Sequence, residues 1–200
     1  MRMPSCKAAA LAAVLLFLGS VEPNTSSRAD NVTAAVPMGA LAHATRVLEK
    51  NTGGKVLEIR IADTGGATAF EAALAQDDGV VYMHVASPSD DVSVIEVKEL
   101  PPWLLNYHLQ AYMRSVAKAE VPLDEAIVMA EARDLAPAIG AGIAKPLNGT
   151  NAVLAYFVET IKGAKRNMLA VDAKSGAFIA NPEAVYERPT PVELARRTAG

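Results

Sequence analysis

The chain reads Leu169-Ala170-Val171-Asp172-Ala173-Lys174-Ser175-Gly176-Ala177-Phe178-Ile179 near its carboxy-terminal end. Apolar residues stand on both sides of a polar turn, which is typical of two strands joined in a β-hairpin. Asp172 can accept a hydrogen bond from a main-chain N–H two residues further along, as in an Asx turn. Gly176 can adopt a positive φ at little cost, which a four-residue hairpin loop with a bulge requires. We therefore predict that Asp172 and Gly176 are structural turn residues, with a ligand-binding role for Asp172 as the alternative.

A weaker copy of this pattern lies 86 residues earlier in the chain (171 minus 85). At this offset Val85 corresponds to Val171, and Phe70 corresponds to Tyr156. The order of apolar and polar segments matches without gaps from about residue 56 to residue 92, although few identities are kept. Such self-similarity predicts an internal structural repeat. The other matches at this offset are Thr64 with Thr150, Ile61 with Leu147, Leu41 with Ile127, and Ala44 with Ala130.

Each copy is predicted to open with a helix. In the second copy Pro122 suits the first helical turn, and Asp124 and Glu125 suit the positive end of the helix dipole. The spacing of apolar residues extends this helix to about residue 132. A similar spacing over residues 38–50 predicts the helix of the first copy.

Short strands follow each helix and are separated by turn residues. Strands joined by tight turns predict an antiparallel meander with the helix on one of its faces. The predicted strands span residues 55–61, 67–76, 80–86 and 92–97 in the first copy, and 139–147, 153–161, 167–172 and 177–180 in the second.

The predicted fold class is therefore α+β, with two tandem repeats at residues 36–97 and 121–182. Each repeat is a helix packed on an antiparallel β-meander. Residues 98–120 are predicted to form an extra helix that links the repeats and starts near Pro102. We expect this helix to pack against the copies, with an aromatic face that lines a ligand as the alternative. Residues 183–200 are expected to form an exposed tail.

The hairpin at residues 169–179 resembles the closing hairpin of the PepSY domain. That family's pattern is an apolar strand, V-D-A, a polar residue, T/S-G and a second apolar strand. The helix start at residues 121–126 also resembles the family, in which a small acidic segment leads into an alanine-rich helix. The resemblance covers most of residues 36–182 and is weaker in the first copy. Its motifs are turn and core positions, which specify a fold more than a function.

The resemblance implies a non-catalytic binding or inhibitory module. Members of the family occur in the propeptides of thermolysin-type peptidases, as small periplasmic or cell-surface proteins, and within membrane proteins. The family shares no catalytic residues that could be carried over to this chain. The chain contains no H-E-x-x-H motif and no attached peptidase, so we expect no action on a peptidase domain of its own.

Residues 1–29 are predicted to be a secretory signal peptide. Arg2 and Lys7 precede an uncharged apolar run over residues 8–18. At about 1.5 Å per residue this run spans roughly 16 Å as a helix, which is much shorter than the ~30 Å core of a bilayer. Small residues at 27 and 29 favour cleavage before Asp30, and a site near Ser20 is the weaker alternative. Cys6 precedes the apolar run, which argues against a lipid-modified cysteine.

Composition excludes several classes of function. The 200 residues include 19 Lys+Arg and 22 Asp+Glu, and aromatic residues make up only 5%. With a net charge of −3 and few stacking groups, nucleic acid is not an expected partner. One cysteine and three histidines at unrelated spacings give no recognisable metal site. We therefore expect no catalytic residues, no cofactor and no metal ligands.

These observations predict an exported, non-catalytic binding module, located in the periplasm or secreted, without a stable membrane anchor once the signal peptide is removed. Its expected partner is a protein or peptide, and the resemblance favours a peptidase that the module inhibits or modulates. The alternative is a small molecule or cell-envelope ligand held in a groove between the two copies. Neither hypothesis makes the protein an enzyme, and an enzyme of unknown type is the third and least favoured alternative.

Overall fold

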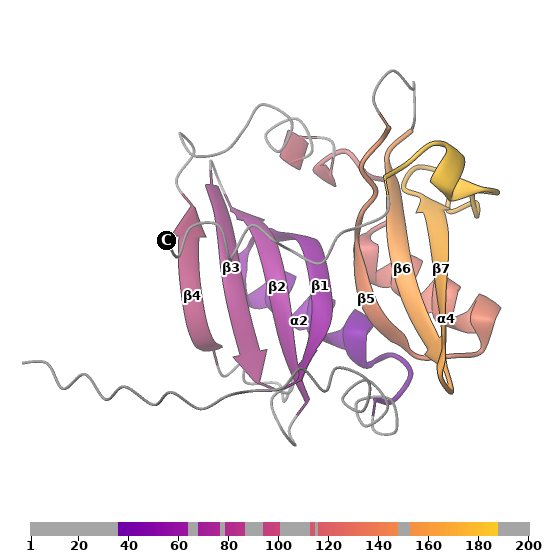
Figure 1. The fold of residues 1–200 in the computed structure, drawn as a ribbon. Helices are drawn as coiled ribbons and strands as arrows, with labels where there is room; N and C mark the ends of the chain where they lie inside the picture. Colours follow the sequence, from indigo (N-terminus) through magenta and orange to yellow (C-terminus); the bar gives the residue numbers. More distant parts are fainter. Residues whose placement is uncertain are drawn as a thin grey trace, which may run out of the picture.

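The computed structural model describes residues 36–63, 68–76, 79–86, 94–100, 113–114, 116–147 and 153–187 (Figure 1). Within these residues, helices and a seven-stranded sheet form an α+β fold, which confirms the predicted fold class. The α-helices are α2 (Ala40–Thr52) and α4 (Leu123–Asp134), and a 3-10 helix, η2 (Pro182–Ala184), follows the last strand. The strands are β1 (Lys55–Asp63), β2 (Thr68–Gln76), β3 (Gly79–Ala86), β4 (Val94–Leu100), β5 (Ala138–Ile143), β6 (Ala155–Lys162) and β7 (Lys165–Asp172).

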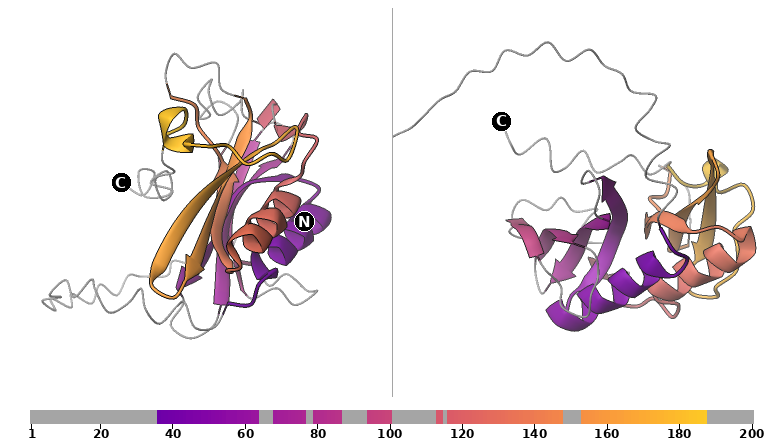
Figure 2. Two further views of the ribbon diagram at one scale, coloured as in Figure 1. Left: turned by 90° about the vertical axis from the view of Figure 1, so that its right-hand side faces the viewer. Right: turned by 90° about the horizontal axis from the view of Figure 1, so that it is seen from below.

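The strands form one antiparallel sheet in the order β4-β3-β2-β1-β5-β6-β7. Strands β1 to β4 make one meander and strands β5 to β7 make another, and the two meanders meet where β1 pairs with β5 (Figure 1). Both α-helices lie on the same face of the sheet (Figure 2). The segment after β7 folds back along it, with a bridge between Val171 and Phe178 at the predicted closing hairpin.

The largest difference between predicted and observed strands is at the end of β5. The prediction continues to residue 147, but the strand ends at Ile143. The chain then leaves β6 and pairs with the carboxy-terminal segment instead, through a bridge between Pro146 and Tyr186. The main-chain N–H of Leu147 also donates to the carbonyl of Val185 at 2.8 Å. This partner lies far away in the sequence, so a local apolar pattern could not indicate it.

Strands β1 and β5 pair over a short register in the middle of the sheet. The facing residues are Glu58 with Gly142, Ile59 with Ala141, and Arg60 with Gly140. Each of these strands also pairs with its second neighbour, and that pairing has an irregularity just before the shared register. In β1 it lies between Val56 and Glu58, opposite β2, and in β5 it lies between Ala138 and Gly140, opposite β6. Ile59 and Ala141 face the helices and are buried.

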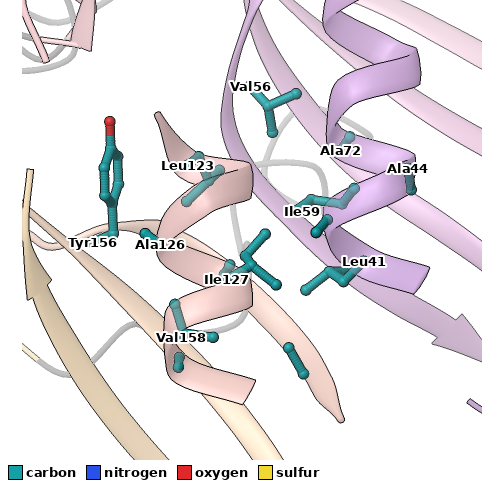
Figure 3. Close-up of a cluster of buried hydrophobic side chains, with 14 of the residues drawn as sticks. Leu41, Ala44, Val56, Ile59, Ala72, Leu123, Ala126, Ile127, Tyr156 and Val158 are labelled. Carbon is teal, nitrogen blue, oxygen red and sulfur yellow. The ribbon is translucent and has the colours of Figure 1, made fainter. Parts of the chain in front are cut away.

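The main core lies between the two helices and the sheet (Figure 3). Leu41 of α2 and Ile127 of α4 are fully buried in it, and so are Ile59, Tyr156 and Val158 from the strands beneath. Buried alanines on both helices let α2 and α4 approach each other closely above the β1–β5 pair. The residues of this core come from both meanders, so neither meander buries its apolar face alone.

The contacts between each helix and its first strand recur at an offset of 82 residues (138 minus 56), not at the predicted offset of 86. Oε1 of Glu49 accepts a hydrogen bond from the N–H of Val56 at 3.0 Å. In the same way, Oε1 of Glu131 accepts a hydrogen bond from the N–H of Ala138 at 2.9 Å. The helices therefore align four residues away from the position that the sequence pattern indicates.

The predicted match of Leu41 with Ile127 is wrong for this reason, and Leu41 corresponds to Leu123 instead. The match of Ala44 with Ala130 is wrong by the same shift. An α-helix has 3.6 residues per turn, so a shift of four residues leaves its apolar face almost unchanged. The apolar pattern alone could not distinguish these two alignments.

The later strands keep the predicted offset. Phe70 of β2 and Tyr156 of β6 each pair with a valine of the following strand. The connection between β5 and β6 is longer than that between β1 and β2. Its extra residues account for the change of offset from 82 to 86 between the helices and the later strands. The predicted match of Ile61 with Leu147 is wrong, because Leu147 lies in this connection and Ile61 lies in β1. The close superposition of the two halves stays a prediction.

Glu131 is a buried carboxylate that joins the two halves. It is only 3% exposed. Its Oε2 accepts a hydrogen bond from the N–H of Gly39 at 2.8 Å, while its Oε1 holds the first N–H of β5. Gly39 is the residue before α2, so a glutamate from α4 caps the amino terminus of the other helix. A negative charge is favourable at this end of a helix.

Replacing Glu131 with alanine is expected to lower the free energy of unfolding by about 3 kcal/mol, because one buried and one partly buried N–H group lose their acceptor at roughly 1–3 kcal/mol each. Glu49→Ala is the matched control, since Glu49 accepts one main-chain N–H and is more exposed. This control should lose about 1 kcal/mol. Urea unfolding of both variants beside the parent measures the difference, and equal losses would contradict the capping role of Glu131.

Residues 185–187 correct part of the prediction of an exposed tail over residues 183–200, while residues 183 and 184 are exposed. Tyr186 is only 2% exposed. Its ring packs edge-on against Phe157, with 5.9 Å between the ring centroids. Its hydroxyl donates a hydrogen bond to the carbonyl of Val153 at 2.8 Å. One tyrosine among polar residues forms no periodic pattern, which is why the sequence did not indicate this contact.

Several predicted features fall outside the described residues. They include the signal peptide at residues 1–29, the tail beyond residue 187 and most of the linking helix. Of that helix, the structure describes residues 113–114 and 116–120, and residues 113, 114 and 116 are helical. Within the described part of the chain, no helix has the length and apolar character needed to cross a membrane.

Candidate functional site

The candidate site lies on the face of the sheet opposite the helices, which we call the outer face. This face is turned toward the viewer in Figure 1. Because side chains alternate along a strand, the neighbours of the core residues Ile59 and Ala141 point to the outer face. The outer-face residues near the β1–β5 pair are Glu58 and Arg60 on β1, Glu71 on β2, Gly140 and Gly142 on β5, and Glu159 on β6.

Apolar contacts cover one end of the outer face. Tyr186 packs on Phe157 there, and Val116 packs with Leu57 and Val80. In Figure 1 the η2 segment (yellow) and the short helical segment before α4 lie toward the top of the sheet. Further down, the charged side chains remain partly exposed, including Arg60 at 35%. A partner could therefore reach the middle and lower parts of the outer face.

Two ion pairs flank the β1–β5 pair. Nε of Arg60 donates to Oε2 of Glu71 at 2.7 Å, and a second guanidinium nitrogen contacts the same oxygen. On the other side, Nη1 of Arg166 donates to Oε1 of Glu159 at 3.1 Å. Glu58 lies two residues before Arg60 on β1, opposite Gly142 of β5, and has no ion pair or carboxylate hydrogen bond to any residue that the structure describes. Among the described side chains around the β1–β5 pair, Glu58 is thus a carboxylate without an ion-pair partner.

Gly142 provides the space that the side chain of Glu58 occupies. A β-carbon at Gly142 would lie 3.1 Å from Cγ of Glu58 and 3.2 Å from the carbonyl oxygen of Leu57. Any side chain there would push Glu58 away, so the glycine is required by this close approach. Gly140 is different, because a β-carbon there would meet its nearest atoms, in Arg60 and Glu159, at 3.7 Å. That separation is an ordinary contact.

Burial raises the pKa of Glu58 from 4.5 to about 7. The charge of Arg60 acts in the opposite direction, and the charge of Glu71 raises the pKa further. Desolvation therefore outweighs the nearby cation, which is already engaged by Glu71. Near neutral pH Glu58 is divided between its protonated and charged forms.

The pKa of Glu58 predicts how stability depends on pH. The folded state holds this proton up to about pH 7, whereas the unfolded chain releases it near 4.5. Stability is therefore expected to fall as the pH rises through this window and to level off above it. Glu58→Gln removes the titration, so this variant should exceed the parent by roughly 1–3 kcal/mol at pH 8 and match it near pH 5. Urea unfolding at both pH values measures this, and parallel pH profiles for the two proteins would contradict it.

The predicted turn residues lie at the end of β7, away from Glu58. Oδ1 of Asp172 accepts hydrogen bonds from the N–H groups of Lys174 and Ser175, both at 2.8 Å. Gly176 has a φ of 72°, and its N–H donates to the carbonyl of Asp172 at 2.9 Å. Partial burial acts to raise the pKa of Asp172, but the hydrogen bonds from Ser175 and Lys174 lower it overall. This is the geometry of an Asx turn closed by a left-handed glycine.

The histidines considered as metal ligands do not come together in the described structure. His43 lies on α2 and His84 on β3, while His108 is outside the described residues. Among the described residues, no three or more side chains of His, Cys, Asp or Glu gather as they would around a metal ion.

Sequence reasoning missed Glu58, Gly140 and Gly142. The alternation of β1 places Glu58 away from the core. Glu58 lacks an ion-pair partner because Arg60 forms its ion pair with Glu71 on β2. The two glycines were read only as parts of a strand. Their spacing of two residues in β5 was the available signal, because it leaves one face of that strand without side chains.

No protein-family model matches the chain, and a search of curated proteins finds no match. Among solved structures, a protein of Clostridium difficile 630 described as a "putative lipoprotein" is similar, with 13% sequence identity and a TM-score of 0.44. The match covers 68% of this chain and 88% of that chain. It assigns no family and carries no functional argument. The resemblance to the PepSY domain therefore rests on the residues at 121–126 and 169–179.

Proposed function

We propose that the protein is an exported, non-catalytic binding module that holds a protein or peptide partner on the outer face of its sheet. One observation carries the proposal: the half-buried carboxylate of Glu58, which has no ion-pair partner among the described residues, lies on the central strand β1 against Gly142 of β5. A sheet selected for stability alone would pair or remove such a carboxylate. Retaining it is favourable if a partner supplies the missing interaction.

Other features support parts of this proposal. The amino-terminal sequence has the charge pattern and the short apolar run of an export signal. The segments that resemble the PepSY domain favour binding over catalysis, and they favour a peptidase as the partner. The arrangement of layers also fits, because both helices cover one face and leave charged, partly exposed residues on the other (Figure 2).

Site-directed photo-crosslinking tests this proposal. A photoreactive residue at Met168 lies on the outer face, in register with Glu159. The control position is Val128, which is exposed on α4 on the opposite side. With the protein expressed in its own cells, we expect a protein adduct from position 168 and none from position 128. If the adduct is a peptidase, its hydrolysis of a fluorogenic peptide should fall when the purified module is added.

Two results would contradict the proposal. One is equal crosslinking from the two positions, which would indicate no preference for the outer face. The other is no protein adduct at position 168 together with a bound small molecule in native mass spectra of the exported protein.

A further inference from the structure

We infer that the outer face binds a lysine or arginine side chain of its protein partner, which lies over Gly140 with its cationic head group at Glu58 and Glu159. This inference rests on the proposed function and specifies the chemistry of the contact. Three observations support it: the balance of charges, the position of one carboxylate oxygen and the space above Gly140.

The charge balance favours a cation. Around the β1–β5 pair the described residues place three carboxylates, those of Glu58, Glu71 and Glu159, against the guanidinium groups of Arg60 and Arg166. Both guanidinium groups are engaged in ion pairs. When Glu58 is ionised, one further positive charge from a partner would balance these five described side chains without breaking either pair. Charge complementarity of this kind selects the partner more than it adds affinity.

Gly140 lies between Arg60 on β1 and Glu159 on β6, and a carboxylate oxygen faces it from the β6 side. Arg166 contacts Oε1 of Glu159, whereas Oε2 of Glu159 is the oxygen that lies 3.7 Å from the position of a β-carbon at Gly140. Glu58 lies on the other side of β5, against Gly142. A side chain that lies over Gly140 can therefore reach Glu159 directly and Glu58 on the diagonal, beside the stem of Arg60, whose guanidinium group is held by Glu71.

Gly140 itself has no structural requirement to be glycine. It is absent from the glycines with positive φ in the described residues, and a β-carbon would fit there without a close contact. Glycine in the interior of a strand is destabilising, and β-branched residues are favoured there. A glycine kept at such a position leaves room for another molecule. The long apolar stems of lysine and arginine suit a bare main chain, because they lie along apolar surface while the charged head reaches its partner.

NMR titration of the chain from Asp30 to Gly200 tests the inference with defined probes. The probes are N-acetyl-arginine amide and N-acetyl-lysine amide, and N-acetyl-citrulline amide is the neutral control with nearly the same shape as arginine. We expect the two cationic probes to shift the amide signals of Gly140 and Gly142 in a saturable way. The citrulline probe should leave both signals in place. Equal shifts with arginine and citrulline probes, or no shift with either cation, would overturn the inference.

Three variants separate binding from folding. Gly140→Val should melt at or above the temperature of the parent and lose the response to both cationic probes. Glu58→Gln should weaken that response at least fivefold at pH 8, where the variant remains folded. Glu125→Gln removes the same charge from the exposed side of α4 and should respond as the parent does. A normal response from Gly140→Val or Glu58→Gln would overturn the inference.

Crosslinking from Met168 distinguishes this inference from the proposed function. If the adduct at Met168 persists at parental strength in Glu58→Gln and Gly140→Val, the inference is wrong and the proposed function stands. If no adduct forms in the parent either, the proposed function is wrong. If the adduct forms in the parent and is lost in both variants, both are supported.

Discussion

The antiparallel pairing of β1 with β5 is the contact on which the rest of the structure depends. It spans only three facing pairs of residues, yet it makes one sheet from two meanders and brings α2 beside α4. Without it, Ile59 and Ala141 would be uncovered, and each helix would lose the other as a packing surface. Glu131 reinforces this contact above the sheet, since it ties the start of β5 to the start of α2. Two segments that would be small for independent domains thus share a common core.

The same pairing also forms the candidate site. Its inward-facing residues fill the core, and its outward-facing residues are the two glycines of β5 with Glu58 and Arg60 of β1. Two of these outer residues, Gly140 and Glu58, are not the choices that would make the sheet most stable. Gly140 leaves one position on the outer face of β5 without a side chain. Glu58 is a carboxylate whose burial disfavours its charged form. Sequence choices that oppose stability are expected where a protein binds something. The β1–β5 pair therefore both stabilises the core and forms the proposed binding site.

The sequence predicts what local patterns control. The hairpin at residues 169–179, the two amphipathic helices and strands β1, β2, β3, β6 and β7 are found close to their predicted positions, whereas β5 ends early and the predicted strand at residues 177–180 is reduced to the bridge at Phe178. It does not predict contacts between distant residues. The pairing of β1 with β5, the cap that Glu131 provides and the packing of Tyr186 on Phe157 all join segments with no common local pattern. The lack of an ion-pair partner for Glu58 also depends on the contact between Arg60 and Glu71, which is formed only in the folded sheet.

Native-state hydrogen exchange of the β1–β5 pair is the most direct test of this account. The central claim is that the two halves form one cooperative unit whose outer face is continuous across that pair. The account predicts that the hydrogen-bonded amides of β1 and β5 exchange only through global unfolding, with the same free energy and urea dependence as the protected amides of β2 and β6. If the amides of the pair exchanged at clearly lower free energy while β2 or β6 stayed protected, the halves would be separately stable, and the account would be contradicted.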